Sequence, residues 1–162
     1  MVQDITLAQL YKGWDVYQGH LVKAIAPLTS EQLTSAISPN LRTVGQIAAH
    51  IARARAAWMH DAMGEGGTDV AEIAQWDWSG AGHTDDAAEL VRALSVTWQN
   101  ISTCLQRWTL ADLEYVFKGE RFGRPYELTR QWVLWHLIEH DMHHGGELSF
   151  VLGAHGLAAP DL

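Results

Sequence analysis

The sequence predicts an all-α fold, a four-helix bundle with crossover connections. Apolar residues recur at spacings of three and four along four long segments, which is the pattern of amphipathic helices. Two long segments rich in glycine and other loop-forming residues lie between the helices. The length of 162 residues, with 48% hydrophobic residues, fits one domain that spans residues 1–162.

The first two helices are predicted over residues 4–26 and 43–63. In the first, Asp4 is the candidate N-cap, and one apolar stripe is formed by Leu10, Trp14, Tyr17 and Leu21. The second follows Pro39 and ends at the glycine-rich residues 64–67. Its apolar residues are Val44, Ile47, Ile51 and Trp58.

Residues 64–83 are expected to form a long connection held down by Trp76 and Trp78. Thr84 then resembles a helix cap followed by acidic first-turn residues, and a heptad-like rhythm of apolar residues continues to Trp108. The segment 113–126 contains glycines and a proline, which favours an irregular or hairpin-like crossover. The last helix is predicted over residues 127–152, ending at Gly153.

Four of the nine histidines fall within residues 136–144. At about 100° per residue, His140 and His144 lie one turn apart on the face that carries the apolar residues of this helix, so both imidazoles should point inward. Their Cβ atoms are about 6 Å apart, which lets both rings reach one ion at about 2.0–2.1 Å. A third ligand must come from another helix, and His50 lies on the inward face of residues 43–63.

We therefore predict a metal site formed by His50, His140 and His144. The alternative is that these are core histidines satisfied by backbone groups or carboxylates, because two histidines four residues apart are common. His136 is interpreted as lining the pocket or supporting a ligand, and His143 as lying on the flank or surface. Glu147 is expected either to hydrogen-bond to a ligand or to lie at an exposed rim.

Two segments, residues 41–52 (LRTVGQIAAHIA) and 135–148 (WHLIEHDMHHGGEL), resemble the DinB-like superfamily of DinB/YfiT-like metal-dependent enzymes. The likeness spans nearly the whole chain. It implies one metal bound by a histidine of the second helix and by two residues four apart in the last, which correspond to His50, His140 and His144. Related members include thiol S-transferases that use bacillithiol or mycothiol, and a mycothiol-dependent isomerase.

The sequence differs from the family pattern after the last ligand. Many members have Arg-Gly there, whereas this chain has Gly145 and Gly146. Any role of that arginine in holding a substrate or partner is therefore in doubt. Glycine inside a helix costs about 1 kcal/mol relative to alanine.

Three neutral histidines leave a coordination position of a divalent ion open, as expected of a catalytic site. Such an ion lowers the pKa of bound water or thiol. We therefore expect a metal-dependent transferase or hydrolase acting on a small molecule, with a low-molecular-weight thiol as the cosubstrate that the resemblance implies. The alternative is a non-catalytic metal- or ligand-binding stress-response protein. Zinc or nickel is favoured as the one divalent transition metal, with iron, copper or manganese as alternatives.

The net charge of −8 argues against nucleic acid as a partner. The sequence contains neither a run of 18 apolar residues nor the features of a secretory signal, so we expect a cytoplasmic protein without membrane attachment. The single cysteine, Cys104, is expected to be a small buried apolar residue rather than a nucleophile.

A homodimer is predicted because the last helix carries a second apolar stripe, formed by Leu134, Trp135 and Ile138. The competing explanation is that the crossover 113–126, with Val116, Phe117 and Phe122, covers this stripe within a monomer. Four tryptophans are candidate walls of a substrate pocket, although core packing is the favoured role of the first two: Trp14, Trp58, Trp76 and Trp78.

Overall fold

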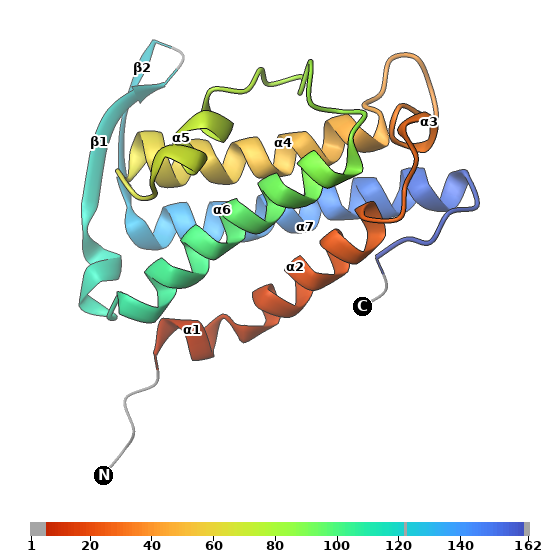
Figure 1. Ribbon diagram of the computed structural model, residues 1–162. Coiled ribbons are helices and arrows are strands. Elements are labelled where there is room, and N and C mark those ends of the chain that lie inside the picture. Colours follow the sequence, from red (N-terminus) through yellow and green to blue (C-terminus); the bar gives the residue numbers. More distant parts are fainter. Residues whose placement is uncertain (1–5, 122, 161–162) are drawn as a thin grey trace.

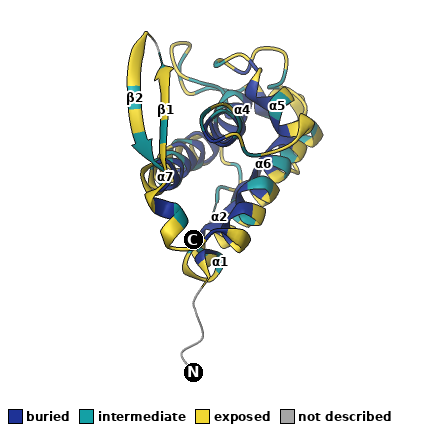
Figure 2. Cartoon of the chain, turned by 90° about the vertical axis from the view of Figure 1, so that its left-hand side faces the viewer, coloured by how far each residue is buried: buried dark blue, intermediate teal, exposed yellow. Residues whose placement is uncertain are grey.

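Four long helices surround a common core in the computed structural model, which describes residues 6–121 and 123–160 (Figures 1 and 2). They are α2 (Lys12–Ile25), α4 (Val44–Ala56), α6 (Ala87–Arg107) and α7 (Arg130–Ala154). The prediction of an all-α bundle is confirmed, with one two-stranded hairpin added to it. Among the described residues, no helix is long and apolar enough to cross a membrane.

The first predicted helix is divided in two. The short helix α1 (Leu7–Leu10) begins with a capping box in which Thr6 and Gln9 bond to each other's backbone, and α2 follows after a bend at Tyr11. The backbone amide of Tyr11 still bonds to the carbonyl of Leu7, so the chain bends without losing this hydrogen bond and places Leu7 in the core. The predicted cap at Asp4 lies outside the described residues.

The second predicted helix is observed with nearly the expected bounds. Thr43 caps α4 through a capping box with Gln46, and the helix continues as the π-helical turn η1 (Ala57–Ala62). Gly64 follows with a φ of 70°, a left-handed conformation that ends the helix. The π turn was not expected, and it places Trp58 at the end of α4.

Two expectations for residues 64–86 were wrong. The connection contains the helix α5 (Thr68–Ala74), which buries Val70 and Ile73 in the core, so apolar contacts stabilise a helix too short to be read from periodicity. The cap of α6 is Asp86 rather than Thr84, because the Asp86 carboxylate accepts hydrogen bonds from the first free amides of the helix. Between α5 and α6 the chain passes over α4 (Figure 1).

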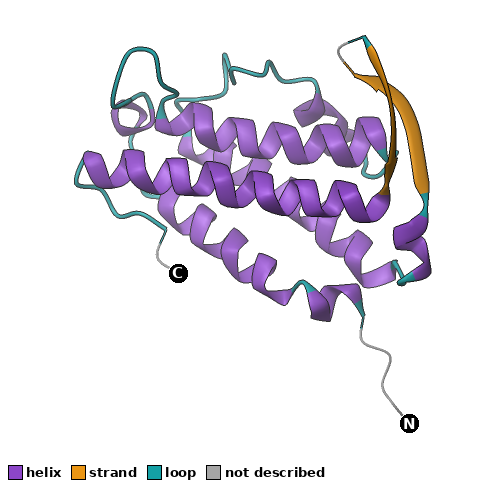
Figure 3. Cartoon of the chain, turned by 180° about the vertical axis from the view of Figure 1, so that it is seen from behind, coloured by secondary structure: helices purple, strands orange, loops and turns teal. Residues whose placement is uncertain are grey.

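The hairpin alternative for the crossover is confirmed. After the 3₁₀ turn η2 (Ala111–Glu114), β1 (Val116–Arg121) pairs antiparallel with β2 (Arg124–Thr129), and the hairpin stands beside the ends of α4 and α7 (Figures 1 and 3). The predicted start of the last helix at residue 127 was wrong, because residues 127–129 pair with β1 and Thr129 caps α7. The helix also continues through Gly153.

A polar layer divides the apolar core into two clusters. Arg55 of α4 and Asp141 of α7 form a fully buried ion pair, 2.7 Å between Nη2 and Oδ2. Trp14 Nε1 donates to Asp141 Oδ2 at 2.6 Å, and Arg55 Nη1 donates to Gln18 Oε1 at 2.6 Å. Gln18 in turn donates to the carbonyl of Leu94 in α6. Each of the four long helices therefore contributes a group to this layer.

The second apolar stripe of α7 is only partly covered. Leu134 is buried, Ile138 is half-buried and Trp135 is 61% exposed. The half-buried hairpin residues Phe117 and Leu128 pack on the same core cluster. The chain thus covers one side of the stripe and leaves Trp135 at the surface, while Phe122 lies outside the described residues.

Candidate metal centre

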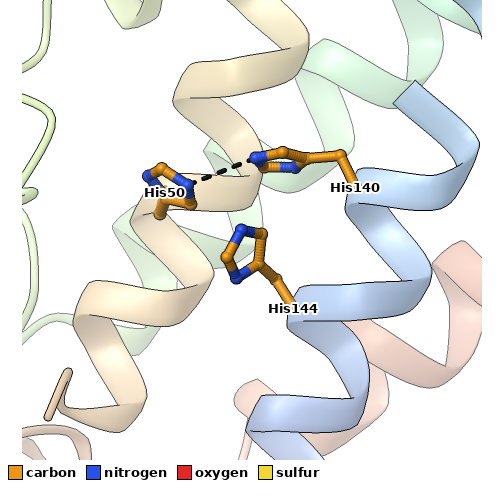
Figure 4. Close-up of side chains that lie close together, drawn as sticks. All are labelled: His50, His140 and His144. Carbon is orange, nitrogen blue, oxygen red and sulfur yellow. Dashed lines mark hydrogen bonds between the residues drawn. The ribbon is translucent and has the colours of Figure 1, made fainter. Parts of the chain in front are cut away.

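The structure brings the three predicted ligands together. His50 projects from α4, and His140 and His144 project from successive turns of α7 (Figure 4). One ligand atom of each lies within 4.8 Å of the others, and no other such histidine, cysteine or carboxylate group of three or more is found among the described residues. The prediction from helical periodicity therefore selected side chains that converge.

The spacing of the nitrogens fits one metal ion. His50 Nε2 and His140 Nε2 are 3.2 Å apart. Two nitrogens that bind one tetrahedral ion at 2.0–2.1 Å are about 3.3 Å from each other. The two helices therefore already hold these atoms at nearly the separation that a shared ion requires.

Glu147 fixes the orientation of His144. Its Oε2 lies 2.8 Å from His144 Nδ1, so Nδ1–H donates to the carboxylate and Nε2 faces the other two rings. Figure 4 shows one nitrogen of the His144 ring directed toward them. Arg42 Nη1 lies 3.7 Å from the same carboxylate oxygen. Both roles considered for Glu147 are thus present, since it is half-buried and bonds to a candidate ligand.

All three imidazoles are held in the neutral form that metal ligation requires. Burial, followed by the nearby Arg42, lowers the pKa of His50 from 6.5 to about 4. Burial, followed by the neighbouring His144, lowers the pKa of His140 to about 2. Burial also lowers the pKa of His144, against the opposing effect of Glu147. Because the unfolded chain binds protons more readily, these groups make the protein less stable as pH falls from about 6.5.

A cleft of about 460 Å³ opens beside the three histidines. Trp58 and Trp78 line it. Trp58 is also buried in the core, which is the role favoured for it, whereas Trp78 lies in the wall as its candidacy predicted. Trp14 belongs instead to the core, where it bonds to Asp141, and Trp76 is buried against the stacked ring of His83. The remaining lining residues are Arg42, Ala54, Arg121, His136 and the three candidate ligands.

The neighbouring histidines lie where they were expected. His136 lines the cleft but does not join the group of three, because its ring stacks on Trp132 and its Nδ1 contacts Glu139 Oε1 at 2.9 Å. His143 is exposed. Cys104 is buried, and burial raises the pKa of its thiol, which favours the apolar role predicted for it.

Gly145 has a packing reason to be glycine. A Cβ atom at this position would lie 1.7 Å from the hydroxyl of Tyr17, which is itself buried and donates to the carbonyl of Asp141. Gly146 has open space around it. An arginine at position 145 would therefore require α2 and α7 to move apart.

The polar layer and the two arginines of the cleft were not predicted from the sequence. A signal for Asp141 exists, since it falls on an apolar stripe between Leu137 and Leu148, and Arg55 falls similarly between Ile51 and Met59. Arg121 carries no such signal, because only the fold of the hairpin brings it to the cleft.

The sequence matches the DinB family over residues 1–162. The fold is similar to a crystal structure of a DinB-like protein from Bacillus cereus ATCC 10987, with a TM-score of 0.75 and 23% sequence identity over 97% of both chains. No curated protein sequence matches this chain significantly.

Proposed function

The chain belongs to the DinB family, and on that premise we propose that it holds one divalent transition-metal ion on His50, His140 and His144 and acts as a metal-dependent transferase or hydrolase. The observation that carries the proposal is the convergence of three neutral imidazoles on one point. We favour zinc or nickel as the ion, and imidazole ligands also suit copper and iron.

The ion would act as a Lewis acid and lower the pKa of a thiol or water that reaches it. The chain's own residues keep the imidazoles unprotonated and fix the ring of His144 through Glu147. The indoles of Trp58 and Trp78 form apolar walls beside the histidines. The cleft volume is in the range of small-molecule sites, which supports a small substrate.

The thiol cosubstrate is supported by the family resemblance alone. Turnover of a low-molecular-weight thiol with an alkylating electrophile, followed with and without added zinc, tests this part of the proposal. Zinc-dependent loss of thiol supports the transferase. Zinc-dependent hydrolysis of an ester without thiol consumption supports the hydrolase. If neither the thiol nor the ester reacts, the result supports a binding protein.

Metal content tests the site itself. Purified protein should carry about one metal ion per chain by elemental analysis, and the double variant His140→Ala, His144→Ala should lose it. His143→Ala is the matched control, because this histidine is on the same helix but exposed. Full occupancy in the double variant would remove the proposed site.

We also propose that two copies associate through the exposed side of α7. Trp135 is exposed there, and a hollow of about 430 Å³ between α2 and α7 is lined mainly by apolar side chains, including Val16, Ile138 and Met142. Adjacent apolar residues that one chain leaves exposed favour burial against another copy.

A further inference from the structure

The loop between α5 and α6, residues 75–86, is seated closely on one face of α4. A Cβ atom at Gly45 would overlap the carbonyl oxygen of Thr84, and one at Gly80 would lie 2.8 Å from the Cβ atom of Ala49. Gly45 and Ala49 are four residues apart, so they share a face of the helix. These small residues let the α5–α6 loop lie directly against α4, over which it passes in Figure 1.

Arg53 lies one turn further along this face and holds the middle of the α5–α6 loop. Its Nε donates to the carbonyl of Trp76 at 2.8 Å, and its guanidinium carbon lies 3.8 Å from the ring centroid of Trp78. The guanidinium carbon of Arg121 also approaches this indole, at 5.6 Å from its centroid. Arg53 thus holds the loop both by its backbone and by a cation–π contact.

Trp78 in turn contacts His50, with 5.8 Å between the ring centroids. His50 Nε2 faces His140, and His50 Nδ1 is buried without a hydrogen bond of normal geometry to any described residue. Burial lowers the pKa of His50, and the backbone of Trp78 opposes this effect, as only a hydrogen-bond acceptor does. The carbonyl of Trp78 is therefore an acceptor within reach of this ring.

An imidazole that binds a metal needs an acceptor for its second nitrogen. Ligation through Nε2 leaves a proton on Nδ1, and a carbonyl or carboxylate that accepts from Nδ1–H fixes the tautomer and the direction of the ring. Glu147 does this for His144 from the same helix. For His50 the corresponding group comes from the α5–α6 loop.

We propose that the backbone carbonyl of Trp78 is the acceptor for His50 Nδ1–H, which leaves Nε2 free for the ion, and that Arg53 is the positioning residue that holds this carbonyl in place. The inference rests on the proposed metal site, to which it adds a support for one ligand. It makes the α5–α6 loop a determinant of metal affinity.

The experiment moves the loop without changing a ligand. Gly80→Ala puts a methyl group against Ala49 and Thr84, whereas Gly82→Ala is the matched control, because its φ of 86° is close to the 73° of Gly80 but the space around it is open. Arg53→Met removes the guanidinium, and Arg53→Lys keeps the charge but loses the planar donor group. Zinc dissociation constants are measured by competition with a chromophoric chelator, and urea unfolding gives the folded fraction of each variant.

Gly80→Ala and Arg53→Met should each raise the zinc dissociation constant about tenfold or more, as is typical when a ligand loses its hydrogen-bond partner, and Gly82→Ala should change it by less than about threefold. The value for Arg53→Lys should fall between those of the parent and Arg53→Met. In metal-free protein, NMR of the imidazole nitrogens should place the His50 proton on Nδ1 in the parent and in Gly82→Ala. Gly80→Ala and Arg53→Met should divide it between the two nitrogens.

A purely structural role of Arg53 and the loop would lower stability but leave the zinc affinity of the folded protein and the His50 tautomer unchanged, and this result would overturn the inference while the metal site stands. Loss of affinity in Gly80→Ala but not in Arg53→Met would overturn the role of Arg53. If the parent bound no zinc, the metal proposal would fail and the tautomer would decide: a proton on Nδ1 that Gly80→Ala displaces supports the inference, and a proton on Nε2 in the parent overturns it.

Discussion

Replacing Asp141 with asparagine should strongly destabilise the protein. The Asp141 carboxylate is fully buried, accepts from both Nε and Nη2 of Arg55, and accepts from the indole of Trp14. Asparagine keeps the shape but removes the negative charge and turns one acceptor into a donor. The guanidinium of Arg55 would then be buried without its counter-charge.

Breaking a buried ion pair on one side costs about 3–5 kcal/mol. For a domain of this size that corresponds to a fall of roughly 6–20 °C in melting temperature. Arg55→Met should cost a similar amount. The double variant should cost less than the sum, because removal of the second charge relieves the burial penalty left by the first. It should still be less stable than the parent, since Gln18 Oε1 would lose the hydrogen bond from Arg55 Nη1.

Urea unfolding followed by circular dichroism measures these free energies, with the exposed Asp85→Asn as a control that should leave stability unchanged. A loss of under about 1 kcal/mol for Asp141→Asn, or strict additivity in the double variant, would refute the argument that the pair is a coupled buried unit.

Three further outcomes are expected. The free energy of unfolding of the metal-free protein, measured with urea, should decrease as pH falls from 6.5 toward 4, since the folded-state pKa of His50 is about 4. His50→Gln should make this dependence on pH weaker. Gly145→Ala should destabilise the protein by about 1–3 kcal/mol, because the added methyl group overlaps Tyr17. Gly146→Ala should leave stability unchanged or raise it by up to about 1 kcal/mol. Equal changes in the free energy of unfolding of the two variants would contradict the packing argument. Sedimentation at tens of micromolar should show a dimer that Trp135→Glu dissociates, and a monomer unaffected by this change would remove the dimer proposal.

Helical periodicity was enough to predict which histidines converge. Residues one turn apart share a helix face whatever the tertiary structure, so the inward direction of His140 and His144 follows from the apolar residues around them. His50 could be paired with them because it lies on the buried side of another long helix. The same reasoning predicted the four long helices.

Features that depend on contacts between distant segments could not be predicted in this way. The start of α7 is set by strand pairing of residues 127–129, and α5 is stabilised by burial rather than by its own propensity. The partner of Arg55 is 86 residues away in the sequence. A charged residue in an apolar stripe signals such a partner but does not identify it.

The two sides of the cleft should differ in how readily their backbone unfolds locally. His50, His140 and His144 are carried by α4 and α7, whose inner faces form the core, whereas Arg121 is carried by a mostly exposed two-stranded hairpin of a kind that is marginal on its own. Backbone amides of the hairpin should therefore exchange hydrogen for deuterium faster than those of the helices. Mutations that reshape the hairpin can consequently change the shape of the cleft while the spacing of the imidazoles is preserved, so that the outer wall of the cleft and the histidine group are free to evolve separately.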